Sequence, residues 1–272
     1  ELLEVDRSLL RNLGIDLWLG GSDRVRVRSN VADRNEIDGV SIQLGKDRHG
    51  VIEDNTITNN GRVGLLLSGR QYQAWDDLAN WDTSLLFNSS HLLVQRNVFG
   101  GNGRTQLPGS RYDVFSTSTR LLALASNCTE TGGEPSVSLG LETEEATFAG
   151  ACGLGTGRTP PTASLTVAGA VPVGTPVVLD ATASAPAVAG ESLSFTWLVQ
   201  PAGAAFVPTD WLPAIVFGGA GGPTESVTFV RPGLFDVDLL VDDSRLGALA
   251  WQVVAALPGG TRIGERASEW TH

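Results

Sequence analysis

Two short runs decide the fold of the first half of this chain: Ile52-Glu-Asp-Asn-Thr-Ile-Thr-Asn-Asn-Gly61 and, one residue later, Val63-Gly-Leu-Leu-Leu67. The first asparagine of this stretch belongs to a series whose members each close a short run of residues: Asn30, Asn55, Asn97 and Asn127. The steps are 25, 42 and 30 residues, which is one period of 25 with insertions of 17 and 5 residues. Such a period indicates one short unit stacked on copies of itself.

Each unit is predicted to contain about three short strands. A glycine series with the same period, Gly14, Gly39 and Gly64, opens one strand of each unit. Alternation after these glycines and before the asparagines places one set of apolar side chains inside: Val27, Val40, Ile42, Ile52, Leu65, Leu67, Val94 and Leu124. One unit is too short to bury its own apolar face, so stacking must bury it. The pattern predicts an all-β fold, a parallel β-helix over residues 1–155.

The asparagine series then has a structural role. Asparagine tolerates the left-handed backbone of a sharp turn, and stacked carboxamides can hydrogen-bond to the copies above and below. We therefore interpret Asn30, Asn55, Asn97 and Asn127 as a structural ladder and not as catalytic residues.

The two runs quoted above resemble the repeat of the right-handed parallel β-helix superfamily, over about residues 10 to 130. That superfamily includes pectate lyases, polygalacturonases, alginate lyases and mannuronan epimerases, and also surface proteins of no known activity. The resemblance implies a solenoid associated with carbohydrate, polysaccharide lyase-like or epimerase-like. No complete catalytic motif of any one family is present, so no catalytic residue is carried over and the enzyme class stays open.

The insertion at residues 70–90 is the first candidate binding site, because insertions between coils often carry the function of a solenoid. Aromatic residues stand there among acidic ones: Tyr72, Trp75, Asp76, Asp77, Trp81 and Asp82. Flat aromatic faces beside carboxylates suit sugar rings. Two alternatives remain, namely that the aromatic residues only anchor the loop, or that the three aspartates bind Ca²⁺, although their spacing matches no recognised calcium motif.

Arg111 and Tyr112 form a second candidate site, about one coil above the insertion. A uronate lyase or epimerase needs a cation against the substrate carboxylate and a base near the C5 proton, which arginine with tyrosine or histidine could supply. The alternative is that these residues, like Lys46–His49, are solvated turn residues.

Cys128 and Cys152 are 24 residues apart, close to one period. Residues one period apart lie one strand spacing apart, about 4.8 Å, which is near the Cα separation that a disulfide accepts. The alternative is that both are small buried hydrophobic residues. A disulfide would agree with an exported protein, extracellular, on the cell surface or periplasmic.

The 25-residue period ends before a linker, residues 156–161. Short alternating strands follow over residues 162–258, and 259–272 form a tail. Three pieces of this segment resemble the PKD family of immunoglobulin-like domains: Val173-Gly-Thr-Pro-Val-Val-Leu-Asp-Ala-Thr-Ala-Ser184, Leu193-Ser-Phe-Thr-Trp197 and Arg231-Pro-Gly-Leu-Phe-Asp-Val-Asp-Leu-Leu-Val-Asp-Asp243. The resemblance implies a β-sandwich that serves as a spacer or binding module, with Trp197 in its core.

The composition of the chain excludes some classes of binding partner. The chain has 30 acidic and 19 basic residues and a net charge of −11, which argues against nucleic acid and anionic membranes as partners. No apolar run reaches the ~18 residues of a membrane span. The start at Glu1-Leu-Leu-Glu4 suggests that further coils precede it, and an uncapped coil end there favours self-association. The sequence thus predicts an exported carbohydrate-associated protein, with a noncatalytic structural or adhesive protein as the alternative.

Overall fold

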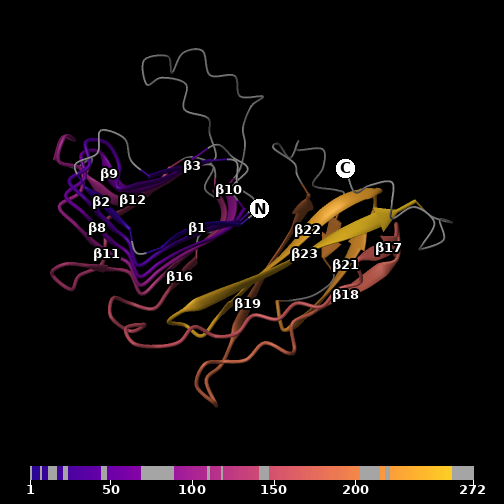
Figure 1. Ribbon diagram of the computed structural model, residues 1–272. Coiled ribbons are helices and arrows are strands. Elements are labelled where there is room, and N and C mark those ends of the chain that lie inside the picture. Colours follow the sequence, from indigo (N-terminus) through magenta and orange to yellow (C-terminus); the bar gives the residue numbers. More distant parts are fainter. Residues whose placement is uncertain are drawn as a thin grey trace, which may run out of the picture. The chain divides into compact units, whose positions relative to one another are not determined.

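The computed structural model describes residues 2–6, 8–11, 17–20, 24–43, 48–68, 89–108, 111–117, 119–140, 147–202, 215–217 and 221–258. All regular elements in these ranges are β-strands (Figure 1). The chain divides into two compact units. Unit 1 comprises residues 1–160 with 244–247, and unit 2 comprises residues 161–243 with 248–272. No helix in the described ranges is long and apolar enough to cross a membrane.

Unit 1 consists of three parallel sheets of short strands. The first sheet is ordered β1 (Leu2–Asp6), β4 (Arg24–Arg28), β7 (Arg48–Glu53), β10 (Ser89–Gln95), β13 (Thr119–Ala125), β16 (Thr147–Ala149). The second is β2 (Leu9–Arg11), β5 (Val31–Asp33), β8 (Thr56–Thr58), β11 (Val98–Gly100), β14 (Cys128–Thr129). The third is β3 (Leu17–Gly20), β6 (Val40–Gln43), β9 (Val63–Ser68), β12 (Tyr112–Thr117), β15 (Val137–Leu139). The chain visits the three sheets in rotation, and each strand pairs with its copy one turn away, an arrangement compatible with a parallel β-helix (Figure 1).

The interior of unit 1 is a stack of aliphatic columns. Val27 pairs in register with Ile52, and Ile52 with Val94. Val40 pairs in the same way with Leu65. All five side chains are fully buried, in one cluster. The inward set that alternation predicted is therefore confirmed, and burial of this kind contributes roughly 25 cal/mol per Å² of apolar surface.

The sharp turn that ends each first-sheet strand uses the residue before the ladder asparagine. Ser29, Asp54, Arg96 and Ser126 have φ values of 55°, 57°, 54° and 51°. The ladder asparagines are not among the described residues with positive φ. The expectation that asparagine supplies the left-handed conformation at this turn is thus wrong. Its carboxamide, not its backbone tolerance, explains its presence.

Unit 2 contains two sheets. One has the order β17 (Ala170–Pro172), β23 (Gly247–Leu257), β22 (Gly233–Asp242), β19 (Ser194–Pro201). The other has the order β18 (Pro176–Asp180), β21 (Thr224–Phe229), β20 (Ile215–Phe217). Both sheets contribute to one hydrophobic cluster, in which Phe229 and Phe235 lie with ring centroids 4.7 Å apart. Trp197, expected in the core, is partly buried against this cluster and donates its indole N–H to the Gly222 oxygen at 3.0 Å.

Candidate functional site

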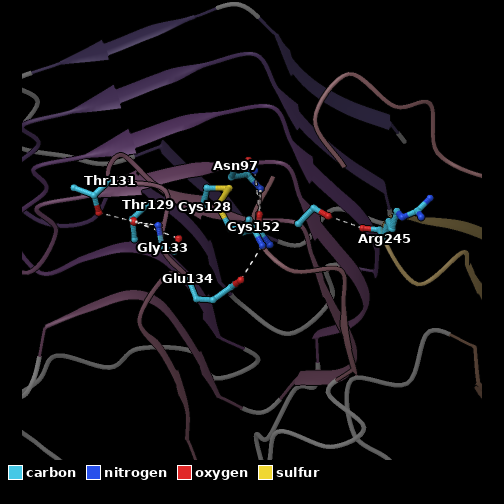
Figure 2. The surroundings of a disulfide bond; sticks show 10 residues. Asn97, Cys128, Thr129, Thr131, Gly133, Glu134, Cys152 and Arg245 are labelled. Carbon is cyan, nitrogen blue, oxygen red and sulfur yellow. Dashed lines mark hydrogen bonds between the residues drawn. A yellow bond between two sulfur atoms is a disulfide. The ribbon is translucent and has the colours of Figure 1, made fainter. Parts of the chain in front are cut away.

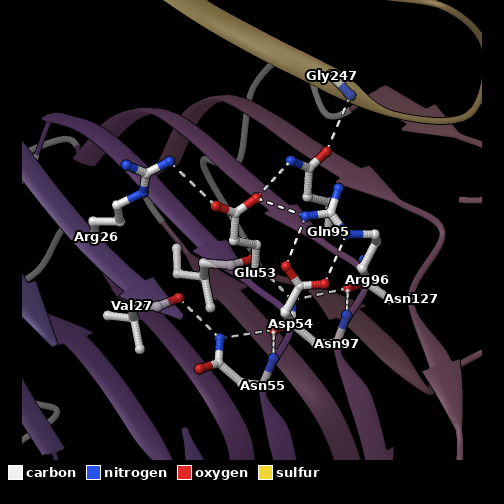
Figure 3. Close-up of polar contacts among 11 residues, drawn as sticks. Arg26, Val27, Glu53, Asp54, Asn55, Gln95, Arg96, Asn97, Asn127 and Gly247 are labelled. Carbon is white, nitrogen blue, oxygen red and sulfur yellow. Dashed lines mark hydrogen bonds and ion pairs between the residues drawn. The ribbon is translucent and has the colours of Figure 1, made fainter. Parts of the chain in front are cut away.

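Four asparagines form a continuous hydrogen-bonded ladder in unit 1, part of which is drawn in Figure 3. The Oδ1 atom of each later asparagine accepts both the main-chain N–H and the Nδ2–H of the asparagine one turn before it, at 2.9–3.1 Å. The Nδ2 atom of each later member also donates to a main-chain oxygen one turn back, that of Val27, Ile52 or Val94. Two N–H groups thus converge on one carboxamide oxygen at each of three steps.

The ladder stops because the next residue in its register is alanine. Ala125 pairs with Ala149, and Gly150 then has φ of 70°, so the left-handed series of Ser126 and its equivalents extends by one more turn. Ala151 therefore stands where a fifth asparagine would stand. Within the described residues, the main-chain N–H of Asn127 has no acceptor and its Nδ2 donates only to Val94. Asn127 is nonetheless only 4 % exposed.

A cavity of about 500 Å³ lies at this end of the ladder. Its lining comes from the last turns of unit 1: Val114, Leu124, Ser126, Asn127, Glu134, Pro135, Val137, Phe148, Gly150 and Ala151. The apolar part of the wall includes two buried residues of the interior stack, Val114 and Leu124, and the largely exposed ring of Phe148. A cavity of this size is within the range of small-molecule sites.

A disulfide joins the residues that directly follow Asn127 and Ala151, two residues of the cavity lining; Figure 2 shows its surroundings. Cys128 and Cys152 are bonded, with their Cα atoms 4.8 Å apart, as their spacing predicted. The Cys152 N–H donates to Glu134 Oε1 at 2.7 Å, so the Glu134 carboxylate is held beside the ladder end. A bonded pair is consistent with an oxidising compartment.

The second asparagine ladder of unit 1 ends differently. Asn35 and Asn60 donate to the Oδ1 atoms of Asn60 and Asn102, respectively, at 2.9–3.1 Å. At its end the Asn102 side chain donates to the Asp113 carboxylate at 2.9 Å. The side-chain amide that closes this ladder therefore has an acceptor in the position where Asn127 has none.

An ion-pair cluster occupies the outward side of the first sheet (Figure 3). Glu53 accepts from Arg26 at 3.3 Å, from Gln95 at 3.1 Å and from Arg96 at 3.0 Å. Arg96 also binds Asp54 through Nε and Nη2, each at 2.7 Å. The hydrogen bonds to Asp54 raise the pKa of Arg96; the charges of Asp54 and Glu53 act in the same direction and burial opposes them. Two arginines thus face two carboxylates, and the cluster is balanced in charge.

We expect Arg96→Gln to lower the free energy of unfolding of unit 1 by about 1–2 kcal/mol. The substitution removes the charge-assisted hydrogen bond between the buried Glu53 carboxylate and Arg96, the less exposed of its two arginine partners. Arg26→Gln is the matched control. The Arg26 side chain is 44 % exposed against 14 % for Arg96, so its loss should cost no more than about 1 kcal/mol. Urea unfolding of both variants measures the difference, and an equal cost would show that burial does not set the strength of these pairs.

The sequence-predicted sugar-binding residues Tyr72, Trp75, Asp76, Asp77 and Trp81 lie outside the described residues, as does Asp82 of the calcium alternative. The other two predicted residues are described. Arg111 is exposed and donates through Nε to the Gln106 oxygen at 3.3 Å, and the Tyr112 ring lies 6.2 Å from that of Phe115. Neither belongs to the cavity lining.

Two histidines lie in neighbouring strands of the first sheet, one in β7 and one in β10. His49 and His91 are buried, one turn apart, with their rings edge to face at 5.4 Å. Both have left-handed backbone. Neither histidine contributes to the cavity lining.

The cavity residues were missed by sequence reasoning, although a signal was present. Gly150-Ala-Cys152 follows Ser126-Asn-Cys128 by 24 residues, so the cysteine spacing also aligns Ala151 with Asn127. The same spacing that predicts the cysteine pair therefore also places an alanine where the asparagine series would continue.

No protein-family model matches this chain, and no curated protein has a similar sequence.

Proposed function

We propose that this chain is part of an exported β-helix protein that binds carbohydrate without cleaving it, with unit 2 as a PKD-like accessory domain. The observation that carries the proposal is the cavity at the end of the asparagine ladder. It combines an apolar wall that includes the exposed Phe148 ring with hydrogen-bonding groups of Asn127 and Glu134. This mixture suits a sugar, which has one apolar face and a rim of polar groups.

The lining of the cavity supports binding over uronate chemistry, because its described residues include no arginine or lysine. A lyase or epimerase needs a cation available to the substrate carboxylate. Arg96 and Arg26 instead face Glu53, and Arg62 forms a bidentate pair with the buried Asp38. These arginines already have carboxylate partners. The disulfide adds support for export.

A glycan array together with a panel of alginate, pectin and glycosaminoglycans tests the proposal. We expect binding to a subset of glycans and no growth of the ultraviolet absorbance of unsaturated uronates. Absorbance growth would establish a lyase and refute the noncatalytic assignment. Silence in both assays would favour a structural or adhesive role, in which the stacked coils form a stalk.

A further inference from the structure

We propose that the open end of the asparagine ladder is a subsite for a neutral amide, and that the amide is the acetamido group of an N-acetylated amino sugar. The assignment to a sugar rests on the proposed function. The assignment of an amide rests on the ladder itself.

The chain supplies its own template for this subsite. At three successive steps, the N–H and Nδ2–H of one asparagine bind one carboxamide oxygen at 2.9–3.1 Å. Asn127 repeats the donor arrangement, because its Oδ1 accepts from Asn97 as the earlier members do and its Nδ2 donates to Val94 as theirs do to equivalent residues. The oxygen for its remaining donors is missing, since Ala151 has no side-chain oxygen. A buried donor without an acceptor costs about 1–3 kcal/mol, so a ligand oxygen placed there is favoured.

The surroundings select a neutral amide over an anion. Glu134 lines the same cavity, and its carboxylate is fixed there by the Cys152 N–H. A second negative charge nearby would be repelled, and the net charge of −11 acts in the same sense. The Glu134 carboxylate can instead accept an N–H or O–H of the ligand.

The apolar wall fits the rest of an acetamido sugar. Leu124 and Val137 offer an apolar contact for the acetyl methyl group. Phe148 is 63 % exposed, so its ring is available to the apolar face of the sugar. The volume of about 500 Å³ admits a ligand of this size.

Substituting Ala151→Asn tests the subsite, because the new carboxamide should occupy the place of the ligand amide and extend the ladder. The full oxidised chain is titrated with methyl N-acetylglucosaminide, methyl glucoside and N-methylacetamide, while ¹H–¹⁵N spectra follow the main-chain and side-chain amides of Asn127. We expect the N-acetylated sugar to shift these signals and methyl glucoside to leave them unchanged. Ala151→Asn should raise the melting temperature and weaken binding roughly tenfold or more. Thr131→Asn, which adds a carboxamide to an exposed loop position outside the cavity lining, is the matched control and should bind as the parent does.

The outcomes separate the two proposals. If N-methylacetamide shifts Asn127 and Ala151→Asn suppresses the shift, but no sugar binds, the amide subsite stands and the carbohydrate function falls. If the sugar binds equally well with and without its acetamido group, or Ala151→Asn leaves its affinity unchanged, the subsite is refuted and the carbohydrate function stands. If no probe perturbs Asn127, or Ala151→Asn changes only the oligomeric state, the acetamido assignment is refuted, the latter result identifying a second copy of the chain as the occupant.

Discussion

Replacing Asn55 with leucine is expected to lower the free energy of unfolding of unit 1 by at least about 3 kcal/mol, at nearly unchanged side-chain volume. Asn55 is 1 % exposed and its side chain makes four hydrogen bonds, with Asn30, Val27 and Asn97. Leucine cannot replace the buried carboxamide that accepts from Asn30 and donates to Val27 and Asn97, and removing one partner of a buried hydrogen bond costs about 1–3 kcal/mol. Urea denaturation followed through the amide signals of residues 24–127 measures the loss.

The neighbouring Thr56→Leu is the control. Thr56 directly follows Asn55 but is only half-buried, on the outward side of β8 (Thr56–Thr58). Its replacement should change the free energy of unfolding by less than about 1 kcal/mol. Equal effects of the two substitutions would show that the ladder bonds contribute little and that the asparagine period has another cause.

Removing the disulfide is expected to have an effect of similar size. Cys128 and Cys152 close a loop with a sequence separation of 24 residues, and the chain-entropy estimate for such a loop is about 3 kcal/mol. The variant with both cysteines replaced by alanine should therefore unfold in unit 1 at lower urea than the oxidised parent.

Reductant provides the control for this prediction. It should shift the parent to the midpoint of the double variant and leave the double variant unchanged. A parent that unfolds at the same urea concentration with and without reductant would contradict a stabilising role of the bond.

The repeat is the part of the structure that could be predicted from sequence, because period and alternation report directly on stacking. Ile52 and Val94 fall 42 residues apart, yet the insertion does not change their register, since only the flanking strands must align. The disulfide could be predicted from the same period, because its two cysteines are 24 residues apart.

The end of the stack could not be predicted in the same way. A sequence period predicts where each turn repeats. It does not predict whether the amide N–H groups of the last asparagine find acceptors where the repeat ends. Ala151 looks ordinary in the sequence, and it matters only because Gly150 keeps the left-handed turn and Asn127 is buried beside it. The insertion at 70–90 suggests a sugar site through its composition alone, and composition carries no information on how its side chains are placed.

Hydrogen exchange of the ladder side-chain amides tests the account most directly. Each Nδ2 of Asn55 and Asn97 donates two hydrogen bonds, whereas that of Asn127 donates one within the described residues. The account predicts slow exchange at Asn55 and Asn97, faster exchange at Asn127, and slowing at Asn127 alone when methyl N-acetylglucosaminide is added. Equal rates at the three positions, unaffected by the sugar, would contradict both the open ladder end and the site proposed there.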